Sequence, residues 1–114
     1  MTVGTRQYES VNSTTTTMSG NADLTITNAS DKLQLVDPGG SARNLDLILV
    51  DASETGVTTS FAEVYIQNEA DADEGLTIRD GNNSDNAISV LDQNAGGWFR
   101  FCAGQWSSST SGLN

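Results

Sequence analysis

Short stretches in which apolar and polar residues alternate recur along the chain from Ala22 onward. In the stretch RNLDLILVD (43–51), three leucines lie two residues apart. A two-residue period is typical of a strand with one buried face, whereas a helix needs apolar residues three and four apart. No window longer than a turn or two shows the helical spacing. The pattern predicts strands at 23–28, 32–36, 43–51, 61–68, 75–80, 86–92 and 97–103.

Turn-forming clusters separate these stretches, among them NASD, DASETG, NEADADEG and DGNNSDN. The segment DPGG, Asp37 to Gly40, adds a proline with a fixed φ and two glycines that can adopt positive φ. Many short strands between turn signals predict an all-β fold, either an antiparallel sandwich or a small barrel of about seven to eight strands.

Alternation also assigns the faces of the predicted strands. The positions expected to face the core are Leu24, Ile26, Leu33, Leu35, Leu45, Leu47, Leu49, Val64, Ile66, Leu76, Ile78, Ile88, Val90, Phe99 and Phe101. The apolar residues expected on the opposite faces are Ile48, Val50, Tyr65, Leu91 and Trp98. A subunit contact needs such outward apolar residues, although scattered exposed apolar residues are also ordinary on a monomer.

Residues 1–20 form a polar leader without an apolar face, and VNSTTTTMSG within it is rich in threonine. Two interpretations remain open: a flexible arm, or an arm that becomes an extended strand on a partner. The expected organisation is an N-terminal arm over 1–20 and one β-domain over 21–114, which ends in a short polar tail.

The charge balance narrows the classes of partner. Fifteen acidic and five basic residues give a formal charge of −10. Nucleic acids and anionic membranes are bound through basic groups, so neither is an expected partner. The start MTVGTRQYES has no apolar core of signal-peptide length, and the longest apolar run is LILV.

The chemistry available for catalysis is sparse. Histidine is absent, which removes the commonest general base and metal ligand. The single cysteine, Cys102, has apolar neighbours and is expected to be a small buried residue. A carboxylate pair of glycosidase type is conceivable, but no pair stands out from its surroundings. We therefore expect no enzyme activity, no cofactor and no catalytic or metal-ligating residue.

The acidic loop Glu69 to Gly75 (EADADEG) is the densest run of charge. Asp71 and Asp73 have the alternate-residue spacing that opens a calcium loop, but the sixth and twelfth positions are Leu76 and Asn82, where glycine and a bidentate acid are needed. A solvated hairpin connection is the expected state, and cation binding is left open.

The stretch GGWFRFCAGQW, Gly96 to Trp106, holds four of the seven aromatic residues. Alternation places Phe99 and Phe101 in the core, and Trp98 and Arg100 on the outer face. Trp106 follows Gly104 and is expected to plug the end of a barrel, with stacking on a sugar as the alternative.

From Ser60 onward, the order of pieces resembles the β-domains of small virion proteins of tailed bacteriophages. The matching features are a strand ending at Asn68, the strand Leu76–Asp80, the apolar strand Ile88–Leu91 and the Gly104-Gln-Trp106 closure. The resemblance covers about half of the chain and extends loosely to about residue 35. Because the chain is short and lacks repeats, it is more similar to head decoration (cement) proteins than to long fibres.

The resemblance implies a homotrimer on the exterior of a phage capsid, made in the host cytoplasm, whose partner is the major capsid protein. Such a protein stabilises the shell by bridging its subunits. The candidate interface residues are Thr14, Thr15, Thr16, Thr17, Ile48, Tyr65, Trp98 and Arg100. The alternative function is a fibre or carbohydrate-binding adhesion module, motivated by the outward Trp98 and Tyr65.

Overall fold

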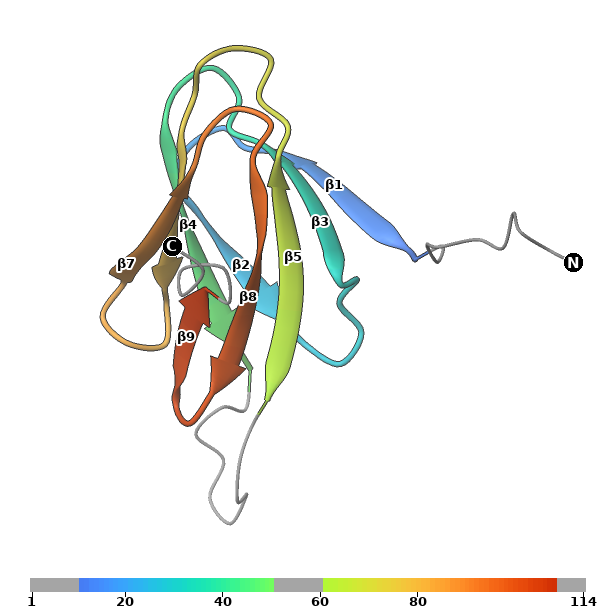
Figure 1. Ribbon diagram of the computed structural model, residues 1–114, viewed down its shortest axis with the longest axis vertical. Helices are drawn as coiled ribbons and strands as arrows, with labels where there is room; N and C mark the ends of the chain where they lie inside the picture. Colours follow the sequence, from blue (N-terminus) through green and yellow to red (C-terminus); the bar gives the residue numbers. More distant parts are fainter. Residues whose placement is uncertain (1–10, 51–60, 109–114) are drawn as a thin grey trace, which may run out of the picture.

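The computed structural model describes residues 11–50 and 61–108. Within these ranges the chain forms nine strands in two packed sheets and no helix (Figure 1). The strands are β1 (Ser13–Thr17), β2 (Ala22–Ile26), β3 (Leu33–Asp37), β4 (Arg43–Leu49), β5 (Ala62–Asn68), β6 (Leu76–Asp80), β7 (Asn86–Leu91), β8 (Gly96–Cys102) and β9 (Gln105–Ser108). The all-β prediction is confirmed, and the arrangement resembles a sandwich rather than a closed barrel.

The order of strands shows how the chain builds the two layers. Sheet A has the order β1-β3-β5-β8-β9, and sheet B has the order β2-β4-β6-β7. From β1 to β6 the chain changes sheet at every strand, so neighbours within a sheet are two strands apart in sequence. The four pairs β1–β3, β3–β5, β2–β4 and β4–β6 are therefore parallel. The pairs β5–β8, β6–β7 and β8–β9 are antiparallel.

The prediction of an antiparallel fold was wrong for this parallel part. A two-residue period identifies a half-buried strand but carries no information about the direction of its neighbour. Parallel neighbours need a crossover connection, and here the crossover is the strand that lies in the opposite sheet.

Part of the predicted arm belongs to the domain's own sheet. Ser13–Thr17 form β1, which pairs in register with Leu33–Asp37 of β3. Residues 1–10 lie outside the described residues. Thr14 donates its hydroxyl to Asp31 Oδ2 at 2.7 Å, which ties β1 to the connection before β3.

The core lies between the two sheets and contains most of the predicted inward residues. Phe99 and Phe101 of β8 are fully buried, as the alternation of GWFRFC predicts. The other predicted core positions that are buried are Ile26, Leu45, Leu47, Val64, Ile66, Leu76 and Ile78. Leu24, Leu49 and Ile88 are partly buried and pack against them.

The prediction for β3 was wrong in its choice of face. Leu33 and Leu35 are half-buried on the outer face, whereas Gln34 and Val36 face the core. In a parallel pair, residues in register share a face, and the register places Gln34 beside Ile66 and Leu33 beside Tyr65. The alternation of β3 was compatible with burial of either face, because Val36 on the face opposite Leu33 and Leu35 is apolar too.

The second error lies in β7, where a bulge shifts the pattern. The register with β6 changes between Ile78 and Arg79. A bulge adds one residue to a strand and reverses the facing of everything after it. Val90, predicted inward, is 59% exposed, and Leu91, predicted outward, is buried in the core.

The DPGG turn behaves as its residues predict. Gly39 and Gly40 of DPGG both have positive φ. A Cβ on Gly39 would lie 2.0 Å from the carbonyl oxygen of Met18, so the position excludes any side chain. Ala103 and Gly104 between β8 and β9 also have positive φ, at 55° and 88°.

Trp106 is buried, but its role differs from a plug in a barrel. Its ring packs edge-on against Phe101 at 5.6 Å, and its indole N–H donates to Asn82 Oδ1 at 3.0 Å. The backbone N–H of Trp106 donates to Asp80 Oδ2. Trp106 therefore joins β9 of sheet A to the β6–β7 turn of sheet B.

Candidate association surface on sheet A

A row of apolar side chains crosses the outer face of sheet A. Leu33 of β3 is in register with Tyr65 of β5, and Tyr65 is in register with Trp98 of β8. Leu35 lies two residues after Leu33 on the same face. Leu33, Leu35 and Tyr65 are half-buried, and Trp98 is 39% exposed. We call these four residues the outer ladder.

The two aromatic rings of the outer ladder hold each other in place. Tyr65 and Trp98 meet edge to face, with ring centroids 5.4 Å apart and an interplanar angle of 79°. A Cβ on Gly96 would lie 2.7 Å from the Tyr65 hydroxyl oxygen, so the glycine leaves the space that the tyrosine ring occupies. The pair presents a stepped apolar surface and not a flat platform.

Charged residues border the outer ladder. Glu63 of β5 and Arg100 of β8 are in register on the same face, and Arg100 is exposed. An apolar strip with a rim of charged groups has the anatomy of a protein–protein interface.

The predicted interface residues do not all lie together. Tyr65, Trp98 and Arg100 share the outer face of sheet A, and Thr14–Thr17 belong to β1 at the edge of the same sheet. Ile48 lies on sheet B, half-buried beside Gly81, and so does not belong to this surface. Leu33 and Leu35 are the members that the sequence prediction missed. Their register with Tyr65 reveals them, and it requires knowledge of the parallel pairing.

Cys102 is exposed on β8, contrary to the expectation that it is buried. The alternation that buries Phe99 and Phe101 places Cys102 on the outer side with Trp98. Strand parity therefore decides its position, and its apolar neighbours do not.

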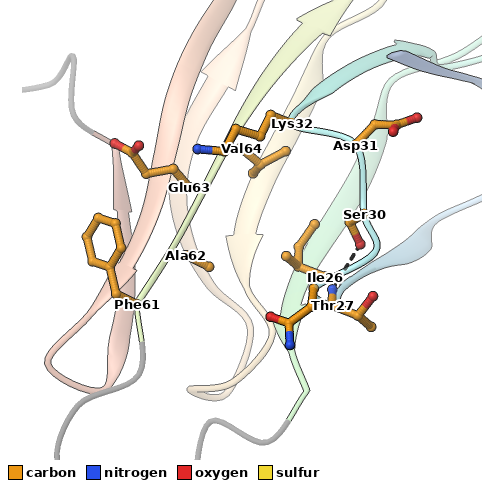
Figure 2. A pocket seen from close by; sticks show the side chains of 10 residues that line it. Ile26, Thr27, Ser30, Asp31, Lys32, Phe61, Ala62, Glu63 and Val64 are labelled. Atoms are coloured by element: carbon orange, nitrogen blue, oxygen red, sulfur yellow. Dashed lines mark hydrogen bonds between the residues drawn. The ribbon is translucent and has the colours of Figure 1, made fainter. Parts of the chain in front are cut away.

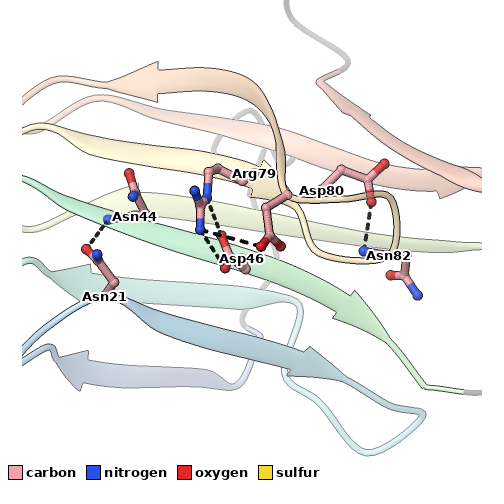
Figure 3. Close-up of polar contacts among 7 residues, drawn as sticks. Asn21, Asn44, Asp46, Arg79, Asp80 and Asn82 are labelled. Atoms are coloured by element: carbon pink, nitrogen blue, oxygen red, sulfur yellow. Dashed lines mark hydrogen bonds and ion pairs between the residues drawn. The ribbon is translucent and has the colours of Figure 1, made fainter.

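On the outer face of sheet B, polar side chains are linked by hydrogen bonds and ion pairs (Figure 3). Arg79 donates from Nε to Asp46 Oδ1 at 2.6 Å and from Nη2 to Asp46 Oδ2 at 2.9 Å. Asp85 lies 3.8 Å from the same guanidinium. The hydrogen bond with Asp46 raises the pKa of Arg79, with the nearby carboxylates adding to the effect, so the group stays protonated. The two outer faces therefore differ, because sheet B carries a bidentate ion pair, whereas sheet A carries the outer ladder.

Three carboxylates meet where β3 ends beside the acidic loop. Asp37, Asp71 and Glu74 each bring an oxygen within 4.8 Å of the other two. Glu74 is buried and accepts a hydrogen bond from Gly40 N–H at 3.1 Å. Oxygen ligands of this kind suit a hard cation such as Ca²⁺. The sequence marked Asp71 with Asp73, but the structure groups Asp71 with Asp37 and Glu74.

A cleft of about 230 Å³ opens between the β2–β3 connection and the start of β5 (Figure 2). Its apolar lining includes Ile26, Ala62 and Val64, and Phe61 is 57% exposed at its border. The polar residues that line it are Thr27, Asn28, Ser30, Asp31, Lys32 and Glu63. The sequence did not identify this cleft, because its residues come from two elements far apart in the chain.

No protein-family model, no curated protein and no solved structure matches the chain. In the part of the chain that the structure describes, no helix has the length and apolar character needed to cross a membrane.

Proposed function

We propose that this protein is a structural component of a virion that binds the outer surface of a phage capsid as a homotrimer and bridges neighbouring capsid subunits. In this proposal it performs no chemistry. The resemblance of the sequence from Ser60 onward supplies the phage context, and the outer ladder is the observation that carries the proposal.

The outer ladder supports association for a physical reason. The outer ladder places four large apolar side chains on one sheet face. Removing them from water lowers the free energy by about 25 cal/mol for each Å² of apolar surface buried. Isolated exposed apolar residues are ordinary, but a contiguous row across three neighbouring strands is a feature of interfaces. Around a threefold axis, the outer ladders of three copies can pack against one another.

The charge of the chain fits a role on a shell. A formal charge of −10 keeps free copies soluble and favours a basic patch on a capsid protein as the docking surface. A protein that binds only the assembled shell stabilises it by mass action, because separating the shell subunits also requires breaking the bridging contacts.

Particles assembled with and without the protein test this proposal. We expect the protein to occupy the shell exterior and to raise the temperature at which particles disrupt, also in the presence of a chelator. Particles of equal resistance with no bound protein would refute the proposal.

A carbohydrate-binding adhesion module is the second candidate, and the cleft at Phe61 favours it. An exposed aromatic side chain beside hydroxyl, amide and carboxylate groups is the combination that binds sugars, which stack on rings and exchange hydrogen bonds. The original motive for this candidate is weaker, because the 79° angle between Tyr65 and Trp98 gives no shared flat face.

A glycan array separates the two candidates. The adhesion function requires binding that Phe61→Ser abolishes and Trp98→Ser leaves intact. Absence of binding to every glycan would remove this candidate and leave the structural role.

A further inference from the structure

The free edge of β1 is a second feature that the outer ladder does not explain. β1 is the outermost strand of sheet A, and among the described residues no strand pairs with its other edge. All five of its residues, Ser13–Thr17, are exposed. A strand edge of this kind presents unpaired backbone N–H and C=O groups to any extended segment.

Natural proteins usually protect such edges with lysine, proline or a bulge, and β1 has none of these. Its sequence STTTT consists of residues that favour extended backbone, and its register with β3 is regular over all five positions. The edge is therefore preformed for strand addition.

The direction of each backbone group on β1 follows from one hydrogen bond. Met18 N–H donates to Asp37 C=O at 2.8 Å, so it points toward β3. Backbone groups alternate in direction along a strand, so those of Thr14 and Thr16 also point toward β3. The groups of Ser13, Thr15 and Thr17 then point to the free edge.

Charge selects the occupant of this edge. Asp31 is bonded to Thr14 near the start of β1, where Lys32 also lies. Asp37 is in register with Thr17 at the end of β1, and Asp71 and Glu74 add two carboxylates beside it. A second copy that paired along this edge would bring the same acidic groups next to these, which is unfavourable.

We infer that β1 accepts an extended segment of a different protein, one that has lysine or arginine near the ends of its strand and small β-favouring residues between them. The identification of that protein as the capsid protein rests on the proposed function. The strand-binding activity itself does not, and it is measured without particles.

A synthetic peptide of about seven residues, with alternating threonine and valine and a lysine at each end, is the probe. Amide resonances of the full chain are followed by NMR as the peptide is added. We expect shifts at β1, and slower amide exchange at Ser13, Thr15 and Thr17 than without peptide. A matched peptide with glutamate at both ends is expected to bind about tenfold more weakly at low salt.

Thr15→Pro removes the central free donor without removing a hydrogen bond between β1 and β3, so it is expected to abolish binding. Thr15→Ala keeps the donor and is the matched control, with unchanged binding. If Thr15→Pro disturbs the fold, the comparison of the lysine and glutamate peptides still tests the inference.

Three results would overturn the inference. The first is that the lysine peptide leaves the β1 amides unchanged. The second is equal binding of the two peptides. The third is slow exchange at Ser13, Thr15 and Thr17 before any peptide is added, which means that residues 1–10 or, where exchange depends on protein concentration, a second copy already occupies the edge. A positive peptide result with no binding to particles would instead reject the capsid role and retain the edge as a strand acceptor.

Discussion

Asn68 at the end of β5 offers the strongest test of how the two sheets are joined. Its side chain is fully buried. The side-chain amide donates to the carbonyl oxygens of Glu74 at 2.8 Å and Leu91 at 2.9 Å, and its oxygen accepts from Ala70 N–H at 2.9 Å. One residue of sheet A therefore fixes the entry to β6 and the end of β7, both in sheet B.

Asn68→Ala leaves two carbonyl groups and one N–H without partners in the interior. Each lost hydrogen bond costs about 1 kcal/mol, and burial of the unpaired group adds to this, so we expect the free energy of unfolding to fall by roughly 3–4 kcal/mol. Asn68→Asp preserves the size but places an acceptor opposite two carbonyl oxygens, so it is expected to cost at least as much.

Urea unfolding followed by tryptophan fluorescence measures both variants. Asn28→Ala, in the exposed β2–β3 connection, is the control and is expected to change stability by less than about 0.5 kcal/mol. A loss below about 1 kcal/mol in Asn68→Ala would refute the reasoning, since the three groups would then have found other partners.

Three further predictions test other parts of the structure. Arg79→Met breaks the bidentate pair and leaves the buried Asp46 carboxylate without this partner, so it is expected to lower the urea concentration at the unfolding midpoint. Arg79→Lys is expected to recover less than half of that loss, because an ammonium group cannot reproduce the two parallel bonds; full recovery would contradict this geometry. Ala103→Asn is expected to raise stability by about 0.5–1 kcal/mol in thermal unfolding, because asparagine tolerates the positive φ of this turn better than alanine does. A loss of stability would show that residue 103 does not adopt this positive φ. Asp71→Asn is expected to raise stability by a few tenths of a kcal/mol by relieving repulsion among the three carboxylates, while Asp73→Asn in the same loop has a smaller effect. The difference should vanish near about 1 M salt, and its persistence there would contradict the electrostatic origin.

The sequence was sufficient to place most strands and most of the core. The alternation in β5 and β8 assigned Val64, Ile66, Phe99 and Phe101 correctly, because each strand has two large apolar side chains at one parity and a charged residue at the other. The turn residues at 37–40 predicted the positive φ values that the structure has.

Where the sequence failed, the missing information was non-local. Leu33 and Leu35 were assigned to the core because the strand itself does not show that Gln34 pairs with Ile66. The bulge in β7 depends on the β6–β7 pairing, and one inserted residue exchanged the positions of Val90 and Leu91.

The residues of the candidate surface were predicted only in part, again because strand pairing is non-local information. Tyr65, Trp98 and Arg100 were recognised from strand parity alone, and the structure brings them together on sheet A. Ile48 had the same parity signal but lies in the other sheet, because parity does not say which sheet a strand joins.

The solution mass of the purified chain, measured by sedimentation equilibrium, tests the central claim that the outer ladder is an association surface. We expect three times the 12.0 kDa of the single chain, and a shift toward 12.0 kDa in Trp98→Ser and Leu33→Ser. Val90→Ser removes an exposed apolar side chain from the outer side of β7 in sheet B and should leave the mass unchanged. A wild-type mass of 12.0 kDa, or an oligomer that Trp98→Ser and Leu33→Ser leave intact, would contradict the account.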